Sequence, residues 1–461
     1  MEKFFEGKKV VIMGLGLHGG GSSCAKFFCG QGADVIVTDL KSEKQLQKSL
    51  EKLKGLDIKY SLSGHKEEDF KKADLIVKNP DVPNDSPFLE IARKNNIPIK
   101  TDVGIFFDLA DSAIIGVTGT KGKSTVSALI YNLLKARFPD AVLAGNIGVS
   151  PLEILPEIGS GSKVVLELSS FELEGLEKSP HVAVITNIVP DHLNRYKSMS
   201  EYIDTKKIIF KYQKPEDVLI LNYDDAVLRK ISKDANSQVY FFSNKLTPET
   251  AEVELVSYVK NSEIFMNEEN RPVIKTGELH IFGEHNVSNV LAAVTAAAIF
   301  KIPRKNIEKV LKSFFGAPHR QEFVLEKKGV EYFNDTAATM PFAAIVALKT
   351  FSTRFPKANI VLIAGGQDKN LEYEDFARVI SDKIKNLVLL PGTASEKIKK
   401  YLAKNVKICA VGSMEKAVNA ACRLSHEGDK VLLSPGAASF NLFKNEYDRG
   451  DQFKKFVKKL K

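Results

Sequence analysis

The segment 116–125, which reads GVTGTKGKST, carries the residue types of a phosphate-binding loop. In such a loop, backbone N–H groups of a glycine turn cradle phosphates, a lysine reaches the outer phosphates and a hydroxyl binds Mg²⁺. Lys123 would be this lysine, and Ser124 or Thr125 would supply the hydroxyl. The spacing is a variant, because one extra residue separates the first glycine from the Gly-Lys pair. An apolar run before the loop and a helix-like run at 126–136 favour this interpretation over a plain glycine turn.

Two candidate metal ligands follow later apolar runs. Glu167 closes the run VVLEL, and His192 comes shortly after another apolar run and Pro190. Side chains at the carboxyl ends of parallel strands face the ligand crevice, and a neutral imidazole can bind a metal. The alternatives are a solvent-exposed glutamate and a structural histidine.

A second glycine turn, GLGLHG at 14–19, fits the dinucleotide-binding pattern G-x-G-x-x-G. Glycines let the backbone approach a diphosphate, and the start of the following helix favours anions. Asp39, which follows the last glycine by 20 residues, could accept a hydrogen bond from a sugar hydroxyl. The pattern predicts a nucleotide-like diphosphate ligand, and a turn without a ligand is an alternative. An NAD-dependent oxidoreductase is another alternative, which leaves the segment 116–125 unexplained.

The elements that must position these residues alternate along the chain, with apolar β-rich runs between helix-like segments. This alternation is typical of βαβ units and parallel sheets. A chain of 461 residues is too long for one hydrophobic core, and we expect about three domains. The predicted fold is therefore α/β, with domains at 1–111, 112–316 and 317–461. Strands are predicted at 8–14, 33–39, 73–79, 114–119, 164–168, 182–188, 330–335, 359–366, 386–392 and 430–436, and helices at 43–53, 126–136 and 290–300.

The composition is that of an ordinary globular protein, with 44% hydrophobic and 27% charged residues. The net charge of +9 fits nucleic acid, an anionic membrane, phosphate-bearing small molecules or a lysine-rich surface. No concentrated basic stripe with interleaved aromatic residues is present, which argues against nucleic acid. The longest apolar helix candidate, 290–300, is much shorter than the ~20 residues needed to span a bilayer. We expect a cytoplasmic protein with neither nucleic acid nor membrane as a partner.

Taken together, the motifs resemble those of the Mur ligase and folylpolyglutamate synthase superfamily. The segment 118–125 is similar to its T-G-T-N-G-K-[ST]-T loop, with Lys121 in place of Asn. The segment 167–174, ELSSFELE, is close to the E-L-S-S-F-Q-L-E of the Mur ligases that add D-glutamate. The resemblance covers essentially the whole chain. Further matches are NIVPDHL at 187–193, EHNVSN at 284–289, PHR at 318–320, LSPGAAS at 433–439 and FKN at 443–445.

This resemblance implies three domains: a Rossmann-like UDP-binding domain, a central P-loop ATPase domain and a C-terminal Rossmann-like domain. It also implies ATP-driven ligation of D-glutamate to UDP-N-acetylmuramoyl-L-alanine through an acyl phosphate, by a monomer that uses Mg²⁺, with two ions expected. The turn at 14–19 would then bind UDP rather than NAD. Another amino-acid-adding Mur ligase and a folylpolyglutamate synthase are alternatives, although the latter lack a UDP domain.

The resemblance also implies the roles of single residues. The catalytic residues would be Lys123, Glu167, His192 and Lys206. The metal ions would be held by Ser124, Glu167, His192 and Lys206. Lys206 would be carbamylated, whereas without the resemblance it is interpreted as a solvent lysine on a helix. ATP would contact Gly119, Thr120, Lys121, Gly122, Lys123, Ser124, Thr125, Asn289, Arg320 and Asp335. The UDP-sugar would contact Leu17, His18, Asp39, Leu40, Lys41 and Asn146, and D-glutamate would contact Thr339, Lys369 and Ser439.

Overall fold

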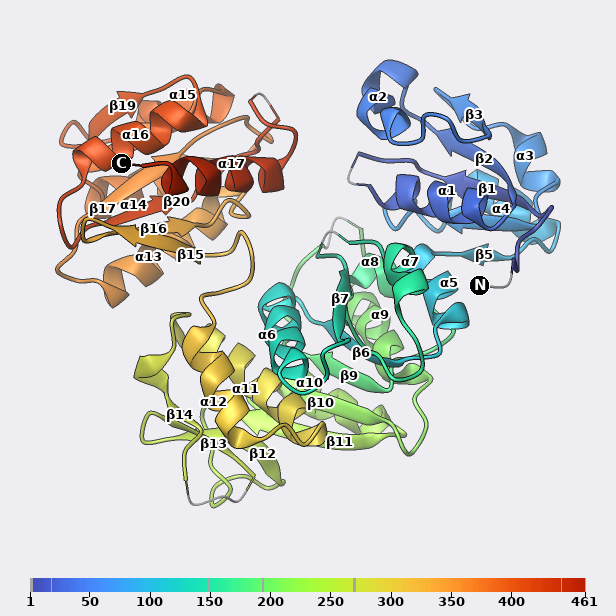
Figure 1. The fold of residues 1–461 in the computed structure, drawn as a ribbon, viewed down its shortest axis with the longest axis horizontal. Coiled ribbons are helices and arrows are strands. Elements are labelled where there is room, and N and C mark those ends of the chain that lie inside the picture. The colour runs from blue at the N-terminus through green and yellow to red at the C-terminus, as the bar shows by residue number, and fades with distance from the viewer. Residues whose placement is uncertain are drawn as a thin grey trace. The chain divides into compact units, whose positions relative to one another are not determined.

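The protein forms two compact units, each built on parallel β-sheets flanked by helices (Figure 1). The computed structural model describes residues 3–17, 19–147, 149–192, 195–267, 271–440 and 442–460. One unit consists of Met1–Glu278 and Glu284–Leu311, and the other of Leu279–Gly283 and Lys312–Lys461. The domain boundaries proposed at 111 and 316 stay predictions.

The first sheet is parallel throughout, with the strand order β3-β2-β1-β4-β5. Its elements are β1 (Lys9–Met13), α1 (Gly20–Gly30), β2 (Asp34–Asp39), α2 (Glu43–Glu51), β3 (Ile58–Leu62), α3 (Glu67–Lys71), β4 (Leu75–Lys78), α4 (Pro87–Lys94), β5 (Ile99–Lys100) and α5 (Asp102–Leu109). Successive side chains of a strand point to opposite faces. Val10 and Ile12 therefore pack with α1, while Val11 and Met13 pack with α3 and α4. Helices thus cover both faces, as parallel sheets require.

The second sheet, in the same unit, has the strand order β14-β13-β12-β11-β10-β9-β6-β8-β7. Its elements are β6 (Ala113–Thr118), α6 (Lys123–Lys135), β7 (Val142–Gly145), α7 (Pro151–Ile154), the 3-10 turn Leu155–Glu157, β8 (Lys163–Glu167), α8 (Ser170–Leu173), β9 (Val182–Ile185), α9 (Met199–Lys211), β10 (Val218–Asn222), α10 (Ala226–Ile231), the 3-10 turn Ser232–Asp234, β11 (Gln238–Ser243), β12 (Leu255–Lys260), β13 (Glu263–Met266), β14 (Ile274–Lys275), the 3-10 turn Thr276–Glu278, α11 (Glu284–Ile299) and α12 (Arg304–Ser313). Strands β6 to β12 are parallel, and β13 and β14 run antiparallel to their neighbours. Because β6 lies between β8 and β9, the loop that follows it opens where the strand order reverses, which is the usual ligand crevice of such sheets.

The third sheet forms the core of the second unit, with the strand order β15-β16-β20-β17-β18-β19. Its elements are β15 (Glu322–Lys327), β16 (Val330–Asn334), α13 (Pro341–Arg354), β17 (Ile360–Ala364), α14 (Glu374–Lys383), β18 (Asn386–Leu389), α15 (Thr393–Tyr401), β19 (Lys407–Ala410), α16 (Met414–Leu424), β20 (Lys430–Leu433) and α17 (Glu446–Lys458). Only β15 is antiparallel among these strands. Leu362 and Ile363 illustrate the two faces: the first packs with α13 to α15, the second with α16 and α17.

Each strand and helix predicted from an apolar run is confirmed, with ends that differ by a few residues. The prediction missed β3, β5, β7, β19 and all strands from β10 to β15. Several of these are short or partly exposed, so they lack a continuous apolar run. No helix in the described part of the chain combines the length and the apolar character needed to cross a bilayer.

The first turn of α1 allows a stability prediction. A Cβ atom at Gly21 would lie 2.5 Å from the Leu15 carbonyl oxygen and 2.7 Å from that of Gly14, whereas one at Gly20 would meet nothing within 4 Å. We expect Gly21→Ala to lower the free energy of unfolding by about 2 kcal/mol or more, because backbone atoms must shift. Gly20→Ala should leave it unchanged or raise it by up to about 1 kcal/mol. Calorimetric unfolding of the two variants beside the wild type is the measurement, and equal stabilities would contradict the prediction.

Candidate functional site

The phosphate-binding loop predicted from sequence connects β6 to α6. Gly119 and Gly122 have positive φ values of 138° and 90°. A side chain at Gly122 would collide with the Asn289 amide, and one at Gly119 with the Thr186 hydroxyl. Glycine is therefore required twice, both by conformation and by close packing. The contact also places Asn289, which was predicted to bind ATP, against the loop.

The segment after β9 holds the loop in place. The Thr120 amide donates to the Asn187 carbonyl at 2.9 Å, and the Lys121 amide donates to the Asn187 side chain at 3.0 Å. The Thr186 hydroxyl donates to the Lys121 carbonyl at 2.6 Å. The hydroxyls of Thr120 and Tyr202 lie 3.1 Å apart. These bonds fix the loop conformation from the surrounding fold.

Lys123 is the first residue of α6, and its ammonium group lies over the loop. Its Nζ donates to the carbonyls of Gly119 and Thr120, each at 3.0 Å. The first turn of α6 contains no acidic residue, and Ser124 is buried within it. Free N–H groups and the helix dipole favour an anion at such a terminus. The loop can thus hold phosphate oxygens, as the sequence predicted.

Glu167 lies at the end of β8, beside Val117 of β6. Its side chain is 1% exposed, and its Oε1 accepts a hydrogen bond from Asn146 Nδ2 at 3.0 Å. Its Oε2 is buried and has no hydrogen-bond partner among the described residues. A buried carboxylate oxygen without a donor is unfavourable. A hard cation such as Mg²⁺ is the kind of ligand that would complete it, so this residue fits the predicted metal role.

Lys206, on α9, is 1% exposed, so its interpretation as a solvent lysine is wrong. Its Nζ donates to the Thr118 hydroxyl at 3.0 Å. Burial, together with the positive charge of Lys123, holds the pKa of the Lys206 amine well below its ordinary range. The next residue, Lys207, differs, because it forms an ion pair with Asp234 at 2.7 Å.

His192 follows β9 in a left-handed conformation, with φ at 54°. Burial and the charges of Lys123 and Lys206 lower the pKa of its imidazole, against the opposing charge of Asp191. A neutral imidazole is the form that binds metals. Lys121 Nζ pairs with Asp191 at 2.9 Å and so links the phosphate loop to this segment.

The four residues predicted to hold metal ions therefore lie around the phosphate-binding loop. Two of them, Glu167 and His192, are of types that commonly bind metal ions. Among the residues that the structure describes, no group of three or more His, Cys, Asp and Glu side chains is placed to hold a metal ion. The predicted set contains only Glu167 and His192 of these types, beside Ser124 and Lys206.

At the turn predicted to bind UDP, Asp39 holds two loops together. Its Oδ2 accepts from the Gly16 amide at 3.1 Å, and its Oδ1 accepts from the Lys41 amide at 2.9 Å. Leu17 and Leu40 are exposed on these neighbouring loops, as is Lys41. The predicted UDP ligand His18 lies outside the described residues.

In the second unit, the loops after β16, β17 and β20 are joined by backbone hydrogen bonds. The Gly436 amide donates to Ala338 at 2.8 Å, and Gln367 and Ala438 exchange bonds of 2.9 and 3.0 Å. These loops carry the residues predicted to bind D-glutamate. Thr339 is half-buried, Lys369 is exposed and the buried Ser439 hydroxyl has no hydrogen-bond partner in the part of the chain described.

Asp335, predicted to contact ATP, is buried at the end of β16. Its Oδ2 accepts from the Ser434 hydroxyl at 2.7 Å, and its Oδ1 accepts from the Gln321 amide at 3.2 Å. Burial raises the pKa of the Asp335 carboxyl to about 7, although the nearby charge of Arg320 opposes this. Arg320 itself is exposed.

Sequence reasoning missed Arg449, a fully buried residue of α17. Its guanidinium donates to the hydroxyl and carbonyl of Thr336, both at 2.9 Å, and to the Ala437 carbonyl at 3.0 Å. Arg449 thereby ties the loop after β16 to the loop after β20. An arginine in a charged helix of the sequence gives no signal of burial, so this role was not predictable.

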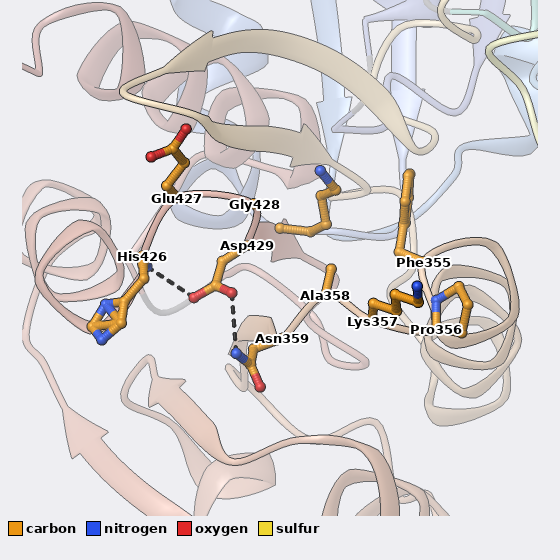
Figure 2. Close-up of a pocket in the computed structure, with 10 residues that line it drawn as sticks. Phe355, Pro356, Lys357, Ala358, Asn359, His426, Glu427, Gly428 and Asp429 are labelled. Atoms are coloured by element: carbon orange, nitrogen blue, oxygen red, sulfur yellow. Dashed lines mark hydrogen bonds between the residues drawn. The ribbon is translucent and has the colours of Figure 1, made fainter.

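A pocket of about 470 Å³ lies in the second unit at the amino ends of β17 and β20, two strands of the third sheet. Within it, Asp429 accepts hydrogen bonds from the Asn359 side chain at 3.1 Å and the His426 amide at 2.8 Å (Figure 2). Ligands of parallel sheets bind beyond the carboxyl ends of the strands, whereas this pocket lies at the amino ends. No predicted site residue lines it, so it is not the candidate site.

Known proteins match the chain along almost all of its length. It matches the "Mur ligase MurD-like, N-terminal domain" over 8–101, the "Mur ligase middle domain" over 117–297 and the "Mur ligase, glutamate ligase domain" over 319–436. A UDP-N-acetylmuramoylalanine–D-glutamate ligase from Roseiflexus sp. (strain RS-1) is 43% identical, over 98% of either chain. One from Acetivibrio thermocellus is 38% identical, over 100% of this chain and 98% of its own.

Solved structures show the same fold. The UDP-N-acetylmuramate–alanine ligase of Thermotoga maritima aligns with a TM-score of 0.63 at 21% identity, over 98% of this chain and 99% of its own. A MurF ligase from Thermotoga maritima in complex with ADP aligns with a TM-score of 0.54 at 17% identity, over 99% of this chain and 96% of its own.

The raised pKa of Asp335 predicts a pH-dependent stability. Because the folded state binds this proton more tightly than the unfolded chain, stability falls as the pH rises from about 4 to about 7. The rise of the Asp335 pKa from its ordinary value to about 7 corresponds to a loss of up to about 4 kcal/mol in the free energy of unfolding at high pH. We therefore expect Asp335→Asn to be more stable than the wild type at pH 8, with a smaller difference at pH 5, in unfolding measured without nucleotide. Asp375→Asn, whose side chain is 79% exposed, is the control. If the stability difference between Asp335→Asn and the wild type is the same at pH 5 and pH 8, the raised pKa of Asp335 is refuted.

Proposed function

Because the chain belongs to the Mur ligase family, we propose that it catalyses ATP-dependent ligation of D-glutamate to UDP-N-acetylmuramoyl-L-alanine, a step of peptidoglycan precursor synthesis. The observation that carries this proposal is the full-length agreement with relatives, 36–43% identical, that are named for this reaction. Agreement over the first domain argues against a folylpolyglutamate synthase. The UDP-sugar would bind at the turn 14–19, which disfavours the NAD alternative.

The reaction requires that a carboxylate become an electrophile. ATP would phosphorylate the terminal carboxylate of the L-alanyl substrate, and the amine of D-glutamate would attack the resulting acyl phosphate and release phosphate. Negative charge gathers in both steps, and preorganised positive groups stabilise it. Lys123 and the amides at the start of α6 would do this, and the hydrogen bonds between the loop and the segment after β9 support the assignment.

The residues that would hold magnesium are Ser124, Glu167, His192 and a carbamylated Lys206. The unpartnered oxygen of Glu167 and the lowered pKa of the His192 imidazole support this assignment. Bound Mg²⁺ would offset the charge of the phosphate oxygens.

Carbamylation of Lys206 is chemically favoured by its surroundings. The neutral amine adds to carbon dioxide, forms an N–C bond and releases a proton, which yields an anionic carbamate. Burial beside Lys123 lowers the pKa of the amine and so favours its neutral, nucleophilic form. The carbamate would place an anionic oxygen group next to the cationic Lys123. An unmodified ammonium group at Lys206 would instead be repelled by Lys123.

The other two substrates would use the two remaining sheets. We propose that the domains 1–111, 112–316 and 317–461 hold the UDP-sugar, ATP and D-glutamate, respectively. Asn146, which donates to Glu167, would contact the sugar close to the reacting carboxylate. In the second unit, the exposed ammonium of Lys369 suits a carboxylate, as does the Ser439 hydroxyl, which has no hydrogen-bond partner among the described residues. Thr339 lies on the neighbouring loop after β16. We further propose a cytoplasmic monomer.

The direct test is phosphate release from ATP with UDP-N-acetylmuramoyl-L-alanine and a panel of amino acids. We expect release to depend on D-glutamate and not on L-glutamate, L-lysine or diaminopimelate. Lys123→Ala, which removes the ammonium group from the loop, controls for contaminating ATPases. Stimulation by L-lysine or diaminopimelate would instead assign the chain to another amino-acid-adding ligase.

The carbamate is tested with two adjacent lysines. Lys206→Ala should lose activity by about 100-fold or more, because an anionic group and its organised contacts are removed. Formate or acetate should restore part of this activity by occupying the vacated space. Lys207→Ala, which removes ion pairs with Asp204 and Asp234, should stay near the wild-type activity.

A spectroscopic readout complements the rate measurements. Wild-type protein in ¹³C-bicarbonate should show a carbamate carbon resonance that is absent from Lys206→Ala. A fully active Lys206→Ala variant, or a resonance that persists in it, would reject the proposed modification.

A further inference from the structure

Glu174 is the last residue of the segment ELSSFELE, and the roles assigned above do not use it. It follows α8 and is 8% exposed. Both of its carboxylate oxygens accept hydrogen bonds from side chains. Arg195 donates from Nη2 to Oε2 at 2.9 Å and from Nε to Oε1 at 3.3 Å. Tyr196 donates to Oε1 at 2.9 Å, and Asn84 donates to Oε2 at 3.0 Å.

One arm of this network reaches the turn predicted to bind UDP. Asn84 lies in the loop 79–86 between β4 and α4, and Arg195 Nη2 also donates to the Pro80 carbonyl of that loop at 3.1 Å. At the start of the same loop, the Asn79 side chain packs against Gly14 and donates to its carbonyl at 3.3 Å. Glu174 therefore holds, through Asn84 and Arg195, a loop that borders the glycine turn.

The other arm reaches His192, the proposed metal ligand. The Arg195 and Tyr196 amides donate to the His192 carbonyl at 2.9 and 3.1 Å. The guanidinium of Arg195 stacks 4.1 Å from the centre of the Phe171 ring, and that ring lies 5.0 Å from the imidazole of His192. The backbone of His192 is thus bonded to residues whose side chains Glu174 holds, and its imidazole contacts the ring on which Arg195 stacks.

A third connection leads to the phosphate loop. The Tyr196 ring lies 5.3 Å from that of Tyr202, whose hydroxyl is 3.1 Å from the Thr120 hydroxyl. Glu174 is also the acidic partner in a cationic neighbourhood, since Arg195 and the buried Lys78 both lie near it. Removing its charge would leave two poorly solvated cations without compensation, which is unfavourable.

We propose that Glu174 is a positioning residue that holds the loop 79–86 and the segment of His192 in one arrangement, so that nucleotide-sugar binding and phosphoryl transfer depend on the same carboxylate. The inference rests on the proposed function. It predicts that a change at Glu174 alters both the KM for the nucleotide-sugar and kcat. A role confined to one of the two loops would alter only one of these constants.

The test compares Glu174→Gln with Glu177→Gln. Glu177 is also a paired glutamate near the end of α8, but its side chain is 71% exposed and accepts a hydrogen bond from Lys100 at 2.7 Å. For Glu174→Gln we expect the KM for UDP-N-acetylmuramoyl-L-alanine to rise about tenfold and kcat to fall about tenfold, because charge-assisted hydrogen bonds to both loops are lost. Glu177→Gln should stay within about twofold of the wild type.

Single-arm variants separate the two effects. Asn84→Ala should raise the KM for the nucleotide-sugar and leave kcat nearly unchanged. Arg195→Lys, which loses the bidentate bond and the stacking on Phe171, should lower kcat as well. Because both residues act through Glu174, their combined effect should be less than the product of the single effects.

Amide hydrogen exchange gives a readout that does not depend on turnover. Exchange in Glu174→Gln should accelerate in both segments, 79–86 and 187–196, relative to Glu177→Gln. If only one segment responds, or if both kinetic constants stay at the wild-type values, the proposal is overturned. If the wild type shows no D-glutamate-dependent phosphate release, the proposed function fails, and the exchange result still decides whether Glu174 couples the two loops.

Discussion

The burial of the Lys206 amine beside Lys123 is the constraint on which the catalytic region depends. Two neighbouring ammonium groups repel each other and burial disfavours charge, so the charged form of the more buried amine is destabilised. The fold determines which one changes. Lys123 Nζ donates to two carbonyls of the loop, whereas Lys206 Nζ donates to the Thr118 hydroxyl and Lys206 is only 1% exposed. Lys206 is therefore the amine whose pKa falls, and its chemistry follows from its position.

Parallel sheets provide the positions. The phosphate loop, Glu167 and the segment of His192 follow β6, β8 and β9, which are neighbours in the second sheet. In the second unit, the loops after β16, β17 and β20 meet in the same way. Because strand ends that are distant in sequence become adjacent in a parallel sheet, residues from 118 to 206 converge although they lie far apart in the chain. The sheet order, more than any single loop, builds the site.

The sequence predicted those parts that depend on local patterns. Continuous apolar runs marked the central strands, and the glycine-lysine spacing marked the phosphate loop. It did not reveal the burial of Lys206 or Arg449, because both result from packing between segments far apart in the chain. It also missed β13 and β14, which are short and antiparallel at a sheet edge. In each of these cases, the structure depends on what packs or pairs next to the residue in space, and not on the residue type alone.

The segment 167–174 shows this dependence within eight residues, since its three glutamates have three different environments. Glu167 keeps one buried oxygen without a partner and so can accept a cation. Glu172 closes a capping box with Ser169, and burial raises the pKa of its carboxyl to about 7. Glu174 is paired with Arg195 and stays fully engaged. One residue type thus supplies a candidate metal ligand, a helix cap and a link between two loops, because the three carboxylates have different neighbours.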